Sequence, residues 1–160
     1  MKKLVIFRGK PTSGKTTALR GLEKKRVMKN WIIIDSSKIK SKLGKKLGMH
    51  ELLKEDMKSK KNILVDETSR KTLNKYLRYH IKKNNYKIIV FQFTVRIDTV
   101  YKRNIQRSEA KLEKYIKKKR IEELEKMHDE RFDKNAFLID TNKLGKTQVI
   151  KFILKKLGLK

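Results

Sequence analysis

Five apolar runs are spaced along the chain. They are LVIF (4–7), WIII (31–34), NILV (62–65), KIIVFQF (87–93) and AFLI (136–139). Four of the five are continuous and do not alternate with polar residues, which is typical of strands buried on both faces of a parallel sheet. The pattern therefore predicts about five parallel β-strands.

Helical spacing fills the intervals between these runs. Leu73, Tyr76, Leu77 and Ile81 fall on one face of a helix, and the last helix has its own apolar face, closed by Gly158. That face consists of Val149, Ile150, Ile153, Leu154 and Leu157. Strands that alternate with helices indicate a three-layer α/β sandwich with right-handed crossovers and helices on both sides of the sheet. We expect one domain over residues 1–160, since no linker or repeat interrupts the pattern.

The residues at the ends of the predicted strands suggest where a ligand binds. Gly9 follows the first run closely, and Asp35, Asp66 and Asp140 directly follow the second, third and fifth. In open parallel sheets the ligand lies beyond the carboxyl ends of the strands. We therefore expect these residues to form the rim of an active site.

The charge of the chain changes the choice of partner. Lysine and arginine number 45 against 17 acidic residues, which gives a formal net charge of +28 over 160 residues. Such an excess attracts polyanions, so nucleic acid is the leading expected partner and an anionic membrane surface the second. A solvated basic surface without a partner is the remaining alternative.

Cysteine usage and hydropathy exclude several classes. The chain has no cysteine, so it forms neither a disulfide nor a thiolate metal site. No apolar run is long enough for a signal peptide or a bilayer span, so we expect a cytoplasmic protein that does not enter a membrane.

Residues 9–17 read GKPTSGKTT, between a predicted strand and a predicted helix. Gly9, Gly14, Lys15 and Thr16 match the phosphate-binding pattern G-x-x-x-x-G-K-[ST] in full. The loop N–H groups and the helix N-terminus would hold the phosphates of ATP or another NTP. Lys15 would reach the β- and γ-phosphates, and the Thr16 hydroxyl would bind Mg²⁺. The residues expected to contact the nucleotide here are Gly9, Pro11, Thr12, Ser13, Gly14, Lys15, Thr16 and Thr17.

Two strand-end aspartates have different expected roles. Asp35 could accept the proton of an attacking hydroxyl, or it could cap the following helix. Asp66 is expected to be the carboxylate associated with Mg²⁺. Lys38 could hold an anionic part of the acceptor, and Arg70 could contact acceptor phosphate or lie on the surface.

A helix after the fourth strand carries two arginines four positions apart. Ile97, Val100, Tyr101 and Ile105 are expected to form its apolar face, while Arg103 and Arg107 project from another flank. Such a pair suits a lid, at about residues 96–120, that stabilises charge on a transferring phosphoryl group. Two solvated cations are the alternative. By analogy of fold alone, Asn142 is placed near the adenine.

Taken together, these motifs resemble the kinase domain of phage-type polynucleotide 5′-hydroxyl kinases, a family of P-loop kinases. The matching elements are GKPTSGKTT, Asp35 with a basic residue at 38, VDET and the KRNIQR lid, and the likeness covers nearly the whole chain. The resemblance implies ATP·Mg²⁺ at Lys15 and Thr16, Asp35 as general base, and Arg107 on the γ-phosphoryl group with Arg103 beside it.

One position departs from the family pattern, and two other classes remain open. Position 38 holds lysine where the family has arginine, so the bidentate contact to acceptor phosphate is lost. The expected activity is phosphorylation of 5′-hydroxyl ends of RNA or DNA. The alternatives are a small-molecule or nucleotide kinase of similar fold, and a nucleic-acid-binding NTPase that switches without catalysis.

Overall fold

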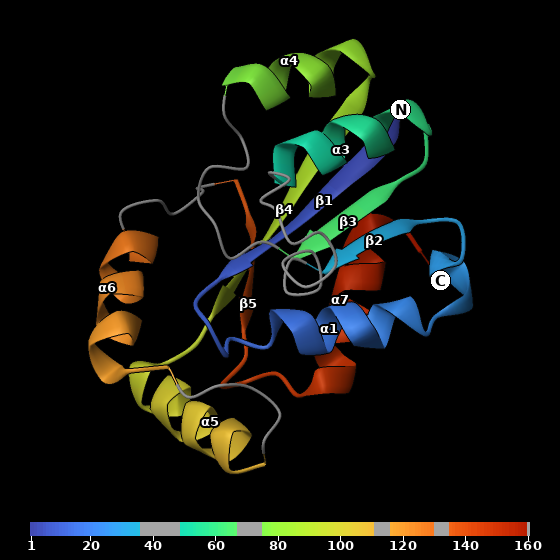
Figure 1. The fold of residues 1–160 in the computed structure, drawn as a ribbon. Helices are drawn as coiled ribbons and strands as arrows, with labels where there is room; N and C mark the ends of the chain where they lie inside the picture. Colours follow the sequence, from blue (N-terminus) through green and yellow to red (C-terminus); the bar gives the residue numbers. More distant parts are fainter. Residues whose placement is uncertain (36–48, 67–74, 111–115, 130–134, 160) are drawn as a thin grey trace.

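The computed structural model describes residues 1–35, 49–66, 75–110, 116–129 and 135–159. Figure 1 shows a single twisted sheet with helices on both of its faces. Its five parallel strands run in the order β2-β3-β1-β4-β5. The strands are β1 (Lys2–Gly9), β2 (Ile32–Asp35), β3 (Ile63–Asp66), β4 (Tyr86–Thr94) and β5 (Phe137–Asp140). The predicted three-layer α/β fold is confirmed, and each apolar run overlaps a strand, three of the runs beginning one residue before it.

Two pairs of helices cover the sheet. Helices α1 (Lys15–Glu23) and α7 (Lys146–Leu157) pack on one face, and α3 (Met49–Lys58) and α4 (Lys75–Lys83) pack on the other. Helices α5 (Ile97–Glu109) and α6 (Lys118–Asp129) lie to one side of the sheet (Figure 1). A short 3₁₀ turn spans Arg26–Met28. No helix among the described residues is long and apolar enough to cross a membrane.

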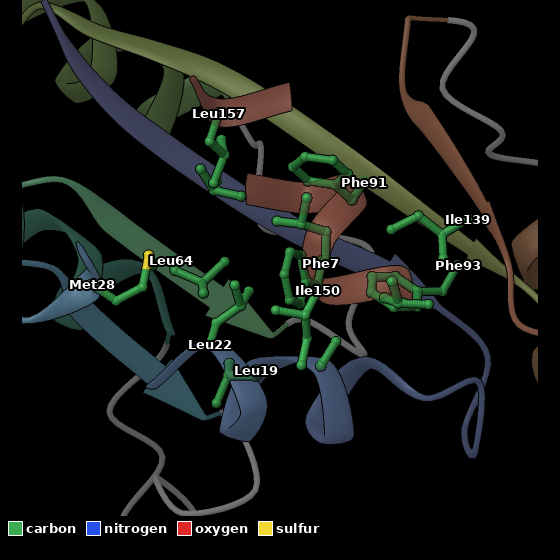
Figure 2. Packing of buried hydrophobic residues seen from close by; sticks show 14 residues of the cluster. Phe7, Leu19, Leu22, Met28, Leu64, Phe91, Phe93, Ile139, Ile150 and Leu157 are labelled. Carbon is green, nitrogen blue, oxygen red and sulfur yellow. The ribbon is translucent and has the colours of Figure 1, made fainter. Parts of the chain in front are cut away.

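Strand β1 explains why the apolar runs are continuous. Val5 and Phe7 point into the cluster under α1 and α7, whereas Leu4 and Ile6 point into the cluster under α3 and α4. All four side chains are fully buried, because successive residues of a strand face opposite sides of the sheet. Figure 2 shows the first cluster, in which the Phe7 ring lies beside those of Phe91 and Phe93.

The small core between α5 and α6 differs from the prediction at one position. Val95, Val100 and Ile121 are buried there, with Ile97 and Tyr101 packed against them, as expected for the apolar face of α5. Ile105, however, is 47% exposed. The buried residue of that turn is Asn104, whose side-chain amide forms hydrogen bonds with the backbone of Ile116, just before α6. The periodicity had predicted a buried hydrophobic side chain in this turn.

Candidate nucleotide-binding site

The residues predicted to form the rim lie at the carboxyl edge of the sheet. Gly9, Asp35, Asp66 and Asp140 are the last residues of β1, β2, β3 and β5. Asp35 and Asp66 are paired in the register of neighbouring strands, which lie about 4.8 Å apart. Both carboxylates are buried, with exposures of 6% and 1%. Two acidic side chains thus lie side by side at the mouth of the phosphate loop.

The phosphate loop takes its shape from two glycines. Gly9 has φ of 151°, and a Cβ built there would lie 2.6 Å from the Phe93 carbonyl oxygen on β4. Gly14 has φ of 94° and forms the N-cap of α1. Glycine adopts such angles without steric cost, so the chain can turn sharply from β1 into α1. Thr12, at φ of 59°, holds a left-handed conformation that costs a non-glycine residue about 1–3 kcal/mol.

Lys15 is folded into the loop that precedes it. Its Nζ donates to the carbonyl oxygens of Gly9 at 2.8 Å and Lys10 at 2.7 Å, and to Ser13 Oγ at 3.4 Å. The side chain is only 4% exposed, and Ser13 is fully buried. The ammonium charge is therefore already held inside the loop, where phosphate oxygens of a nucleotide can replace these carbonyl partners.

Thr16 and Asp66 form the part of the site suited to a cation. The Thr16 hydroxyl donates to Asp66 Oδ2 at 2.7 Å, which joins the first turn of α1 to the end of β3. A hydroxyl oxygen and a carboxylate are the ligands that Mg²⁺ prefers, and this ion commonly takes only one or two protein ligands besides water and phosphate. The donor set fits Mg²⁺, and the binding of this ion by Thr16 and Asp66 stays a prediction.

A cavity of about 570 Å³ opens beside the loop, bounded by residues from the starts of α1 and α7 and from α5. Six of the residues that line this cavity were predicted from the sequence, either as nucleotide contacts or as part of the lid. They are Thr12, Gly14, Thr17, Arg103, Arg107 and Asn142. Its volume lies within the range of small-molecule sites. Pro11 is half-exposed in the loop and is not among the lining residues.

Several lining residues were not predicted from the sequence. They are Ala18, Gln106, Thr141, Lys143, Leu144, Gly145, Lys146 and Val149. Four of the eight, Thr141, Lys143, Leu144 and Gly145, belong to the segment that joins β5 to α7, and Lys146 and Val149 lie in the first turn of α7. Their position directly after Asp140 could have indicated them. The chain that follows the last strand must pass the carboxyl edge of the sheet before the next helix begins.

Arg103 fastens α5 to the phosphate loop. Its Nη1 donates to the Thr12 carbonyl oxygen at 3.2 Å and to Thr141 Oγ1 at 3.1 Å, and its Nη2 donates to the Thr141 carbonyl oxygen at 2.9 Å. Burial, and secondarily the charge of Arg107, lower the pKa of the Arg103 guanidinium. Thr12 Oγ1 also donates to the Val100 carbonyl oxygen at 3.4 Å. The first arginine of the predicted lid is thus a structural link, and Arg107 lies beside it in the cavity wall.

Asn104, between these arginines in sequence, organises the approach to α6. Its Nδ2 donates to the Ile116 carbonyl oxygen at 2.8 Å, and its Oδ1 accepts from the Ile116 N–H at 3.1 Å. The side chain is 3% exposed. One amide satisfies both backbone groups of residue 116, so Asn104 anchors the segment that leads into α6.

The turn after β5 places Asn142 at the cavity. Its backbone N–H and Nδ2 both donate to Asp140 Oδ1 at 2.9 Å, and these bonds lower the pKa of the Asp140 carboxyl. Asn142 Oδ1 accepts from the Arg96 N–H at 3.4 Å. Asn142 lines the cavity, and its predicted place near the adenine stays a prediction. Lys38 and Arg70 lie outside the described residues.

Comparison with solved structures identifies the fold. The Mycobacterium tuberculosis APS kinase shares it with a TM-score of 0.65 at 14% identity, over 98% of both chains. The Deinococcus radiodurans tunicamycin resistance protein gives 0.63 at 16% identity, over 100% of this chain and 98% of that one. A chain of the Pnkp1/Rnl/Hen1 RNA repair complex gives 0.59 at 21% identity, over 82% of this chain and 46% of that one.

These likenesses show that the chain has the α/β fold of P-loop kinases. No family model and no curated protein sequence matches it. At such identities the comparison concerns the fold alone, so the narrower resemblance to polynucleotide kinases stays a prediction.

Proposed function

We propose that this chain is a kinase that uses ATP and Mg²⁺ to phosphorylate 5′-hydroxyl ends of RNA or DNA. The observation that supports it most is the pairing of Asp35 with Asp66, whose carboxylate accepts the Thr16 hydroxyl at 2.7 Å. A phosphoryl-transfer site needs a base close to the metal and the γ-phosphate. The neighbouring strand end supplies one.

The reaction assigns one role to each of these side chains. The Asp35 carboxylate takes the proton of the acceptor hydroxyl, and the hydroxyl oxygen forms a bond to the γ-phosphorus. The bond from the γ-phosphorus to the β–γ bridging oxygen breaks, and ADP departs with that oxygen. Lys15 and Arg107 stabilise the charge on the transferring group. Mg²⁺, held through Thr16 and Asp66, would neutralise phosphate charge.

The charge of the molecule favours a polymeric acceptor over a metabolite. A net charge of +28 creates a wide positive field, which concentrates a polyanion near the protein but contributes little for a small acceptor. Lys38 and Arg70 are proposed contacts for acceptor phosphate.

The direct test uses γ-labelled ATP with Mg²⁺ and matched RNA and DNA oligonucleotides that carry 5′-hydroxyl ends. Oligonucleotides already phosphorylated at the 5′ end serve as blank acceptors. We expect label at the 5′ end, lost in Lys15→Ala. In Asp35→Asn the rate should fall about 10²–10⁴-fold with ATP binding retained, because that change removes the base and keeps the shape.

Three outcomes contradict the proposal. Unchanged transfer by Asp35→Asn would remove the general base from the mechanism. Transfer to small hydroxyl compounds but to no oligonucleotide would favour a metabolite kinase. Binding of ATP and oligonucleotide without transfer to any hydroxyl would favour a nucleotide-dependent switch.

A further inference from the structure

The exposed side of α4 carries a solvent-exposed aromatic ring. Tyr79 is 60% exposed, whereas every other phenylalanine, tyrosine or tryptophan whose side chain the structure describes is buried or half-buried. A tyrosine ring normally gains free energy by burial against other groups. An exposed ring on a regular helix therefore suggests contact with something outside the chain.

Two lysines lie on the same side of the helix as this ring, whose centre is 5.3 Å from that of the His80 ring in an edge-on contact. Lys82 and Lys83 follow Tyr79 by three and four positions, and all three side chains are exposed. The Lys83 Nζ lies 6.0 Å from the centre of the Tyr79 ring. On the opposite side Ile81 is 4% exposed and packs into the core. We refer to Arg78, Tyr79, Lys82 and Lys83 as the α4 surface.

Acidic side chains are absent from this part of the sequence. Residues 68–97, which include all of α4 and β4, contain no aspartate or glutamate. Exposed Lys61 and Lys87 extend the positive charge past the end of α4, where the Tyr86 hydroxyl donates to the Lys61 carbonyl oxygen at 2.6 Å. Helix α3, which packs beside α4, bears Glu51, Glu55 and Asp56 and bounds the surface on its side.

We propose that the α4 surface is a docking site for single-stranded nucleic acid, outside the nucleotide cavity. A single strand presents unstacked bases and phosphates in alternation, and this surface offers a ring for one base and ammonium groups for the adjoining phosphates. A duplex encloses its bases and leaves the ring without a partner. A membrane surface requires a broad apolar side, and the α4 surface has one ring.

The test measures binding without ATP, so it does not depend on catalysis. The probe is a fluorescent single-stranded oligonucleotide already phosphorylated at its 5′ end, and its anisotropy is followed at several salt concentrations. Tyr79→Ala should weaken binding about fivefold or more, because stacking of a base is lost, and Tyr79→Phe should bind like the wild type. The salt slope should remain unchanged in both.

The lysine pair has a matched control on the other face of the sheet. Lys82→Ala/Lys83→Ala should weaken binding and reduce the salt slope by about 1.4, since each phosphate contact on a single strand contributes about 0.7. Lys155→Ala/Lys156→Ala removes the same charge from α7, where Lys156 also lies over an aromatic ring, that of Phe137 at 4.9 Å. This control should lose much less affinity.

Several results would overturn the proposal. Wild-type affinity in Tyr79→Ala excludes stacking on this ring, and equal losses in the two lysine pairs reduce the effect to net charge. Weaker binding of Tyr79→Ala to phosphatidylserine vesicles, with oligonucleotide binding unchanged, would assign the surface to a membrane. Failure of the kinase assay would leave these binding results unaffected, so the two proposals are tested separately.

Discussion

At Gly9 the close approach of β4 leaves no room for a side chain. A Cβ would lie 2.6 Å from the Phe93 carbonyl oxygen and 2.9 Å from the Phe93 Cβ, and φ is 151°. Gly158, the C-cap of α7, also has a positive φ of 68°, but a Cβ there would meet no atom within 4 Å. The two glycines therefore separate the effect of a steric clash from that of backbone conformation.

We expect Gly158→Ala to lower the free energy of unfolding by about 1 kcal/mol, the cost of a left-handed residue with a side chain. Gly9→Ala should cost more, since backbone of β4 must also move, and it should weaken ATP binding because the loop shifts. Urea denaturation and ATP titration of both variants measure these effects. Equal losses of stability would show that the loop absorbs the clash.

A second residue-scale effect concerns the pH dependence of stability. Burial, and secondarily Glu55, raise the pKa of the Asp56 carboxyl above its ordinary value of 3.8. The folded state therefore binds this proton more tightly than the unfolded state, so Asp56 lowers the free energy of unfolding as pH rises from 3.8 through the raised pKa. Asp56→Asn should stabilise the protein at pH 7 and lose this advantage near pH 3.5. Urea midpoints across that range test the sign, and a gain independent of pH would contradict it.

At the scale of an element, helix α5 shows which parts of the site can be predicted from patterns in the sequence. The spacing of Arg103 and Arg107 predicted a common edge, and both line the cavity. Their difference in role was hidden, because Arg103 binds backbone carbonyls of residues 12 and 141, which are remote in sequence. Strands were easier to predict: burial on both faces requires a continuous apolar run. Asn104 was missed because its partners are backbone groups of residue 116, which no side-chain periodicity reveals.

Replacing each lid arginine by lysine tests this division of roles. Arg103→Lys keeps the charge but loses the planar fork that reaches Thr12 and Thr141 together. We expect it to lower the free energy of unfolding by about 1–3 kcal/mol even without nucleotide, since part-buried acceptors lose a charged donor. Arg107→Lys should leave stability nearly unchanged and reduce kcat more than it raises KM for ATP. Thermal unfolding and steady-state kinetics of both variants make the comparison, and the reverse pattern would exchange the two roles.

At the scale of the whole molecule, the excess of positive charge acts on folding as well as on partners. A formal charge of +28 repels itself most strongly in the compact state, so added salt should raise the melting temperature by screening.

At constant ionic strength, tripolyphosphate should raise the melting temperature further, because a preformed phosphate loop binds the anion only when the protein is folded. A concentration of 100 times Kd corresponds to about 2.7 kcal/mol. Lys15→Ala should abolish most of this second increase, while Lys155→Ala, which removes the same charge from the surface of α7, should retain it. If both variants lost the increase equally, tripolyphosphate would be responding to the net charge of the protein. The loop around Lys15 would then not be its specific binding site.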